Sequence, residues 1–172
     1  MAKNVSNKTI DNVTIRFAGD SGDGMQLSGG RFTQTSAVVG NDLSTLPDFP
    51  AEIRAPAGSL AGVSSFQIHF SSQEIHTPGE KPDVLVAMNP AALKVHLKDL
   101  VPGGTLIVNK NAFTKKNLTL AGYEDDPTEY GSLVDYYSTH FIEMGKLVTN
   151  ACEGIDIPSK MVDRTKNLCA LG

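Results

Sequence analysis

One strand–helix–strand segment in the middle of the chain constrains the fold more than any other feature. It opens with the apolar run Val84–Met88, which is typical of a strand covered on both faces. Asn89 and Pro90 follow as a helix N-cap and a first-turn proline, and leucines recur behind them at helical spacing. The turn 102–104 then leads into a second apolar strand, 105–109. Such a βαβ unit predicts a parallel sheet with helices packed on its faces.

Segments on both sides extend this pattern. Alternating apolar and polar residues predict strands at 13–17 and 63–70. The polar Gln67 and His69 are expected in the second strand if it has one wet face or lies near a sheet edge. A short strand is expected at 43–46 within a proline-rich loop. The other expected elements are a strand within 133–142 and helices at 25–39, 143–151 and from 157 onward. The expected fold class is α/β, a three-layer α/β/α sandwich around a mainly parallel, Rossmann-like sheet.

Bulk composition limits the classes of function. The 172 residues fit one compact domain, and 19 acidic against 15 basic residues give a net charge of -4, which disfavours a nucleic-acid partner. The two cysteines, Cys152 and Cys169, cannot supply the four thiolates of an iron–sulfur cluster. Residues 1–8 carry no apolar secretory core, and no apolar run reaches the roughly 20 residues of a membrane helix. We therefore expect a cytoplasmic protein with no membrane partner.

A glycine-rich loop between the first predicted strand and helix consists of Gly19, Asp20, Ser21, Gly22, Asp23 and Gly24. Backbone N–H groups and the helix dipole can hold a phosphate or carboxylate at such a place. All three glycines can take a positive φ, but their spacing reverses the dinucleotide fingerprint. Asp20 and Asp23 would repel an anion unless they cap N–H groups or face away. A tight structural turn, or a contact surface against a neighbouring domain, stands beside the anion site as an interpretation.

The residues that follow the loop argue against a metal site. In the thiamine-diphosphate signature an aspartate such as Asp23 holds magnesium and an asparagine ligand follows at a characteristic distance. Here that distance reaches 48–51, where no asparagine stands, so the metal would lack a ligand. The histidines show no metal-ligand spacing either, and they are His69, His76, His96 and His140.

Within the first helix, the pair Gly29 and Gly30 predicts close packing against the sheet.

The second candidate site is the proline-flanked loop 49–58, which carries Glu52 and Arg54. Arg54 can fork onto a substrate carboxylate or a phosphate, while Glu52 fixes its pose. An ordinary ion pair at the surface or between domains is the alternative. Under both interpretations the loop is expected to face a partner.

The end of the sequence grows steadily more apolar. Pro158 is expected to start a helix in which Met161, Leu168 and Leu171 have no cover. Such an end predicts either a partner surface or a continuation into a longer chain. The same helix has a small basic face, solvated or in contact with phosphate, made of Lys160, Arg164 and Lys166.

Four motifs in a fixed order resemble one known family. They are Phe-Ala-Gly-Asp-Ser-Gly-Asp-Gly at 17–24, the loop 49–58, Pro-Asp-Val-Leu-Val-Ala-Met-Asn at 82–89, and the closing stretch 164–172. Together they resemble the gamma domain of 2-oxoacid:ferredoxin oxidoreductases, at the front of a 2-oxoglutarate-type alpha subunit. The Ala-Glu-Ile-Arg-Ala-Pro form of the second motif is more similar to the 2-oxoglutarate branch than to the pyruvate branch.

This resemblance implies an oxidative decarboxylation in which 2-oxoglutarate, coenzyme A and oxidised ferredoxin give succinyl-CoA, carbon dioxide and reduced ferredoxin. Thiamine diphosphate, Mg²⁺ and an iron–sulfur cluster would lie in the rest of the enzyme, with none bound by this segment alone. Residues 1–158 would form the gamma domain, a lid over the active-site entrance. Residues 159–172 would begin a helix that leads to a thiamine-pyrimidine domain.

The partners implied by the resemblance are the rest of the alpha subunit, the beta subunit, coenzyme A, the 2-oxoacid and, indirectly, ferredoxin. The loop Gly19–Gly24, Glu52, Arg54 and Asn89 would face the active site, and no catalytic residue would lie in this segment. We therefore expect a subunit fragment of an oxidoreductase that is inactive alone. Two alternatives stay open: a stand-alone coenzyme A or nucleotide carrier that uses the glycine loop, and an interaction protein that docks by its C-terminal helix.

Overall fold

The computed structural model describes residues 10–50, 62–129, 131–158, 161–162 and 165–171. Its sheet has six strands in the order β2-β3-β1-β4-β5-β6. The strands are β1 (Asn12–Asp20), β2 (Asp42–Asp48), β3 (Val63–Ser71), β4 (Val84–Ala87), β5 (Thr105–Asn109) and β6 (Ser138–Ile142). The helices are α1 (Met25–Val38), α2 (Pro90–His96), α3 (Lys115–Leu120), α4 (Ser132–Tyr136), α5 (Met144–Ala151) and α7 (Lys166–Cys169), with 3-10 turns η1 (Leu97–Asp99) and η2 (Lys110–Ala112).

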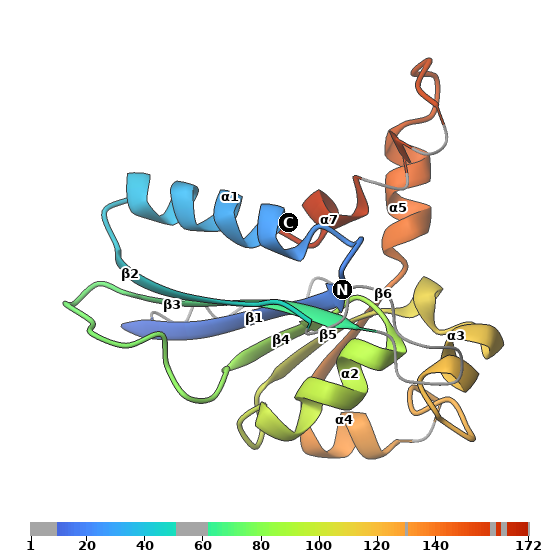
Figure 1. Cartoon of the computed structure of the whole chain (residues 1–172), viewed down its shortest axis with the longest axis horizontal. Helices are drawn as coiled ribbons and strands as arrows, with labels where there is room; N and C mark the ends of the chain where they lie inside the picture. Colours follow the sequence, from blue (N-terminus) through green and yellow to red (C-terminus); the bar gives the residue numbers. More distant parts are fainter. Residues whose placement is uncertain (1–9, 51–61, 130, 159–160, 163–164, 172) are drawn as a thin grey trace, which may run out of the picture.

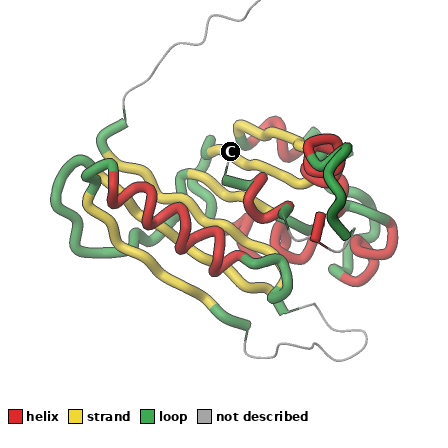
Figure 2. Tube along the Cα trace, turned by 90° about the horizontal axis from the view of Figure 1, so that it is seen from above, coloured by secondary structure: helices red, strands yellow, loops and turns green. Residues whose placement is uncertain are grey.

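The elements form the three layers predicted from the sequence. Helices α1 and α7 cover one face of the sheet, and α2 and α4 cover the other (Figure 1). Seen from above, α1 lies along the strands of one half of the sheet (Figure 2). The pairings β1–β4, β4–β5 and β5–β6 are parallel, whereas β1–β3 and β2–β3 are antiparallel. The sheet is therefore mixed, with its parallel part built on the predicted βαβ unit.

Two hydrophobic clusters hold the layers together. Below the sheet, Leu85 and Leu106 pack with Leu93 of α2, all three fully buried. On the opposite face, Phe17 and Ile68 pack with Met25 at the start of α1. Because β4 contributes to both clusters, its uniformly apolar sequence is explained by cover on both faces.

Two strand predictions differ from the structure at their boundaries. The strand expected at 43–46 is longer, since β2 extends to Asp48 and includes Pro47. Proline is tolerated there because β2 is an edge strand, whose outward N–H groups need no partner in the sheet. The stretch 133–142 contains a short helix, α4, before β6 begins.

The polar face of β3 is only partly wet, since His69 is half-buried and Gln67 is buried, but β3 does lie near a sheet edge, next to β2, which was the other expectation. Gln67 is only 1% exposed, and its side-chain oxygen accepts a hydrogen bond of 2.9 Å from Nε of Arg16. Arg16 also bonds to Asp99 and to Nδ1 of His96. Burial, and then the charge of Arg16, lower the pKa of His96. A buried polar network therefore joins β3, β1 and the end of α2.

The apolar end of the chain is partly covered by the domain itself. Cys169, Ala170 and Leu171 pack against the cluster that contains Phe17 and Met25, which contradicts the expected lack of cover at Leu171. By contrast, Met161 and Leu168 are exposed, as the sequence predicted. Within the described ranges, no helix has both the length and the apolar character needed to cross a bilayer.

The glycine pair of α1 divides into one tight and one open position. A Cβ at Gly29 would lie 2.1 Å from Cδ1 of Phe66 on β3, so the predicted close packing is confirmed there. A Cβ at Gly30 would meet no atom within 4 Å, so close packing is wrong for this residue.

These two glycines provide a matched pair of substitutions. Gly29→Ala should lower the free energy of unfolding by about 1–3 kcal/mol, because the methyl group overpacks against Phe66. Gly30→Ala should raise it by roughly 0.5–1 kcal/mol through helix propensity alone. Urea unfolding of both variants measures the difference, and equal effects of the two would contradict the packing.

Candidate functional site

The carboxyl ends of β1 and β4 create a place where a ligand can enter. These strands are parallel neighbours, and the chain leaves β1 toward α1 on one face but leaves β4 toward α2 on the other (Figure 1). The connecting loops diverge as a result. In open α/β sheets, ligands bind in the crevice outside such a topological switch point.

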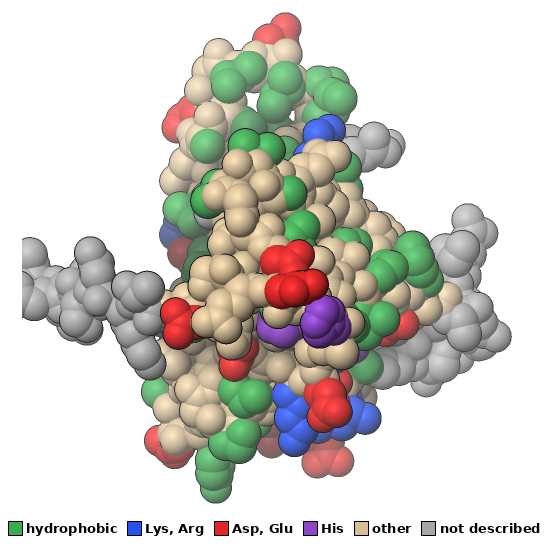
Figure 3. Space-filling model, turned by 90° about the vertical axis from the view of Figure 1, so that its left-hand side faces the viewer, with side chains coloured by type: hydrophobic (Ala, Val, Ile, Leu, Met, Phe, Trp, Pro, Cys, Tyr) green, Lys and Arg blue, Asp and Glu red, His purple; other side chains and the backbone are tan. Residues whose placement is uncertain are grey.

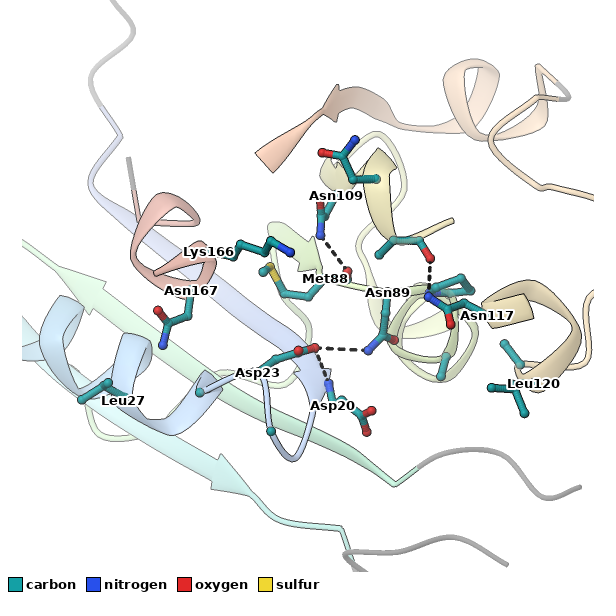
Figure 4. A pocket seen from close by; sticks show the side chains of 17 residues that line it. Asp20, Asp23, Leu27, Met88, Asn89, Asn109, Asn117, Leu120, Lys166 and Asn167 are labelled. Atoms are coloured by element: carbon teal, nitrogen blue, oxygen red, sulfur yellow. Dashed lines mark hydrogen bonds between the residues drawn. The ribbon is translucent and has the colours of Figure 1, made fainter. Parts of the chain in front are cut away.

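A cleft of about 830 Å³ occupies this position. We call it the carboxyl-edge cleft; its walls are the glycine loop, the starts of α1 and α2, the end of β5, α3 and α7. Figure 4 shows Lys166 and Asn167 of α7 on one side and Asn117 and Leu120 of α3 on the other. Its volume lies within the range of about 300–1,000 Å³ that is usual for small-molecule sites.

A short hydrogen-bonded chain ties the glycine loop to α2. Oδ2 of Asp23 accepts from the backbone N–H of Asp20 at 2.8 Å and from Nδ2 of Asn89 at 3.3 Å. The Oδ1 atom of Asn89 caps α2 by accepting from the N–H of Ala92 at 2.8 Å, as the sequence predicted for this N-cap. Asp23 therefore caps an N–H group, which is one of the two arrangements expected for it.

The electrostatics around Asp23 disfavour added negative charge. Burial raises the pKa of Asp23, and the nearby Asp20 carboxylate adds to the rise. The hydrogen bonds from Asp20 and Asn89 and the charge of Lys166 oppose it without cancelling it. A phosphate placed beside this carboxyl group would meet the same unfavourable environment.

The glycine loop needs its special backbone at one residue. Of the three glycines that can take a positive φ, Gly24 does so, with a φ of 71°, and Gly19 and Gly22 do not. A Cβ at Gly24 would also lie 2.3 Å from Nδ2 of Asn167, and a Cβ at Gly19 would lie 2.8 Å from the Asp23 carboxylate. The loop is shaped by close contacts as well as by its turn.

Residues 14–172 match the family model described as pyruvate ferredoxin/flavodoxin oxidoreductase. The chain belongs to this family. Nearly the whole sequence is matched, including the glycine loop and the segment that contains α7. The resemblance found in the sequence motifs is thereby confirmed.

Two curated relatives of the chain are longer proteins. The 2-oxoglutarate oxidoreductase subunit KorA of Mycobacterium tuberculosis is 57% identical over 163 residues, which are 95% of this chain and 25% of KorA. The 2-oxoglutarate synthase subunit KorC of Methanothermobacter marburgensis is 37% identical over 98 residues, 55% of this chain and 49% of KorC. The chain thus spans about a quarter of the first relative and half of the second.

Two solved structures of oxidoreductases share the fold. The 2-oxoglutarate:ferredoxin oxidoreductase of Magnetococcus marinus, solved with 2-oxoglutarate, coenzyme A and succinyl-CoA bound, matches 95% of this chain and 24% of its own, with a TM-score of 0.68 and 23% identity. The gamma subunit of a keto/oxoacid ferredoxin oxidoreductase from Geobacter sulfurreducens matches 92% of this chain and 96% of its own, with a TM-score of 0.56 and 18% identity. At these identities the likeness concerns the fold.

The structure of this family member brings together most of the predicted site. Asp20, Gly22, Asp23, Gly24 and Asn89 all line the carboxyl-edge cleft. Gly19 and Ser21 belong to the same loop but do not line the cleft. Glu52 and Arg54 fall outside the described residues.

Sequence reasoning missed four asparagines and a lysine as parts of this cleft. Asn109 is the last residue of the buried strand β5, so its place at a carboxyl strand end could have singled it out. The other lining residues depend on tertiary packing and carry no local signal; they are Asn111, Asn117, Lys166 and Asn167.

The end of the molecule opposite the carboxyl-edge cleft carries both histidine and acidic side chains. Figure 3 views that end, where histidine side chains lie beside acidic ones. Nδ1 of His69, on β3, makes a hydrogen bond of 2.8 Å to the carbonyl of Thr77. Within the part of the chain that the structure describes, no group of three His, Cys, Asp or Glu residues is placed to hold a metal ion.

Asp23 leads to a test of stability against pH. Its folded-state pKa lies above the ordinary value of 3.8, so wild-type stability should fall as pH rises from 3.8 through the folded pKa. Asp23→Asn removes this ionisation and keeps an acceptor for the Asp20 N–H. The variant should therefore gain free energy of unfolding relative to wild type as pH rises from 3.8 through the folded pKa of Asp23.

Urea unfolding across that pH range measures the effect, with the exposed Asp125→Asn as the matched control. A difference between Asp23→Asn and wild type that stayed constant with pH would contradict the raised pKa.

Proposed function

We propose that this chain acts as the gamma domain of a 2-oxoglutarate:ferredoxin oxidoreductase and serves there as a lid and assembly domain. The whole enzyme would convert 2-oxoglutarate, coenzyme A and oxidised ferredoxin to succinyl-CoA, carbon dioxide and reduced ferredoxin. The 57% identity to KorA over 95% of the chain supports this substrate. The boundaries proposed are 1–158 for the domain and 159–172 for the start of a connection to a thiamine-pyrimidine domain.

The observation that carries the proposal is the chemical character of the carboxyl-edge cleft. It sits at the switch point, where substrates bind in this class of fold. Its described lining offers carboxamides, two carboxylates and an ammonium group, but no serine, cysteine or histidine. Such a lining can bind and orient a substrate, and its described titratable groups are Asp20, Asp23 and Lys166.

The cofactors belong elsewhere under this proposal. Thiamine diphosphate would supply the stabilised carbanion and the iron–sulfur cluster the electron transfer, and both would be held with Mg²⁺ by the remaining alpha and beta subunit sequence. The glycine loop, Asn89, Glu52 and Arg54 would face the shared active site from this domain.

A stand-alone carrier of coenzyme A or a nucleotide is the second candidate, and the size of the cleft favours it. Two observations weigh against the version that uses the glycine loop as a phosphate cradle. Asp23 already occupies the N–H of Asp20, and burial raises the pKa of that carboxyl. The match to only a quarter of KorA also favours a part of a larger enzyme.

The enzymatic proposal is tested by comparing two preparations. The full-length protein assembled with its second subunit should reduce ferredoxin when 2-oxoglutarate and coenzyme A are supplied. Residues 1–172 alone should not. Absence of 2-oxoglutarate-dependent reduction by the assembled protein, or full activity of the segment alone, would overturn the proposal.

The role of the cleft is tested by Asn89→Ala in the assembled enzyme. This change removes both the α2 cap and the tie to Asp23, so we expect the KM for coenzyme A to rise about tenfold with a smaller change in kcat. Thr114→Ala removes a comparable helix cap, on α3, from a residue outside the cleft lining. An equal rise in KM for the control would assign the effect to cap loss alone.

A further inference from the structure

The two edge strands of the sheet differ in how well they are protected against pairing with a further strand. β2 and β6 stand at the ends of the strand order, so each has one side without a neighbour among the described strands. In β2, Pro47 lacks an N–H group, and Asp42 and Asp48 place a carboxylate at each end. Proline and charge are common ways to protect an edge strand. By contrast, β6 (Ser138–Ile142) contains no proline and no Lys, Arg, Asp or Glu.

The direction of the β6 backbone groups follows from the first contacts of this strand with β5. The N–H of Ser138 donates to the carbonyl of Gly104 at 2.9 Å, and the carbonyl of Tyr136 accepts from the N–H of Gly103 at 3.1 Å. In a parallel pair, the N–H and C=O of one residue point to the same side, and the side alternates along the strand. The register of β6 on β5 is continuous to its last residue. Even-numbered residues of β6 therefore bond to β5, and odd-numbered residues face the open side.

Thr139 and Phe141 are the odd-numbered residues of β6, and they present two N–H and two C=O groups at the open side. No described residue donates to these carbonyls or accepts from these N–H groups. Such a row of backbone groups is a template for one more strand. The missing partner is therefore an extended segment of backbone, rather than a small molecule or a helix.

Exposed apolar side chains accompany this edge on the sheet face that α4 covers (Figure 1). The hydroxyl of Thr139 donates to the carbonyl of Leu133 in α4 at 2.9 Å, so Thr139 and, by alternation, Phe141 point to that face. Phe141 is 39% exposed, and Val134 and Tyr136 of α4 are 57% and 72% exposed. A partner that extends the sheet at β6 would also gain apolar contacts there.

The open side of β6 is complementary to itself. In an antiparallel pair of two β6 strands centred on His140, Thr139 of each copy lies opposite Phe141 of the other. All the free backbone groups of both residues are then bonded, and His140 faces its own counterpart at the non-hydrogen-bonded position between them. A two-fold contact places each group near its own copy, so a charged edge would repel itself. The absence of Lys, Arg, Asp and Glu from β6 removes this obstacle for a chain whose net charge is -4.

We propose that two copies of this chain pair through antiparallel β6 strands, which joins their two six-stranded sheets into one continuous sheet across a two-fold axis. The contact closes on itself, because the described edge left on each copy is β2, which proline and aspartate protect. The inference goes beyond the proposed function and does not depend on it.

His140→Cys tests the contact in the full-length protein assembled with its second subunit. The two Cα atoms at this position would lie about 4.5 Å apart, which is within the range of a disulfide bond. After mild oxidation with diamide, non-reducing electrophoresis should show at least about tenfold more linked dimer than Ser138→Cys, whose Cα atoms would lie roughly 14 Å apart. The wild type, with its free Cys152 and Cys169, gives the background.

Phe141→Pro separates strand pairing from chance collision. Proline removes the outward N–H of this residue and leaves the bonds to β5, because that N–H points away from β5. Combined with His140→Cys, it should lower the amount of linked dimer at least about fivefold. Phe141→Ala loses the side chain but retains the N–H, so the same combination should lower it by less than about twofold. Thr139→Pro, which removes the other outward N–H, replaces Phe141→Pro if thermal unfolding shows that this variant does not fold.

Three outcomes overturn the proposal. The first is that His140→Cys gives no more linked dimer than Ser138→Cys. The second is a linked species that contains a different polypeptide, which would show that β6 pairs with another chain. The third is equal linkage in the folded proline and alanine variants, which would show that the backbone groups of β6 do not make the contact.

Discussion

The parallel pairing of β1 with β4 is the constraint on which the site depends. Both strands end at the same edge of the sheet, yet one continues into a helix above it and the other into a helix below. The two loops must therefore separate, which leaves a crevice at this edge of the sheet. The glycine loop, the cap of α2 and the end of β5 meet there for this reason. The β1–β4 pairing therefore sets the position of each lining residue that these loops contribute.

The buried carboxyl group of Asp23 then limits which ligands the carboxyl-edge cleft can bind. Asp23 is kept at the edge of the cleft by the N–H of Asp20 and the carboxamide of Asn89, although burial raises its pKa. The backbone N–H groups of a glycine loop before a helix often bind phosphate. Here the Asp23 carboxyl group accepts the hydrogen bond from the N–H of Asp20 instead. Carboxamides fill the remaining wall, and they can both donate and accept without adding charge. The cleft is thus suited to orient a neutral polar ligand.

The arrangement agrees with the proposed function, in which this domain positions a substrate and other parts of a larger oxidoreductase hold the cofactors. The chain corresponds to a quarter of KorA and matches nearly the whole of a Geobacter gamma subunit in fold. Its cleft lining can position a substrate, and the proposed catalysis and electron transfer would lie outside it. The α7 segment contributes both to the fold and to the cleft, because it packs against α1 and also supplies Lys166 and Asn167 to the cleft lining.

The sequence by itself determined the layers and half of the site. Apolar runs, the Asn89 cap and the glycine loop are local signals, and they sufficed for the three-layer fold, the βαβ unit and the family. Tertiary structure decided what distant segments share: the burial of Gln67 by Arg16, the cover of Leu171, and the arrival of Asn111, Asn117 and Asn167 at one cleft. These depend on contacts between residues up to 139 positions apart, as in the bond from Ser28 to Asn167. Periodicity reports which face of an element is apolar, but it contains no information about which polar groups that face will meet.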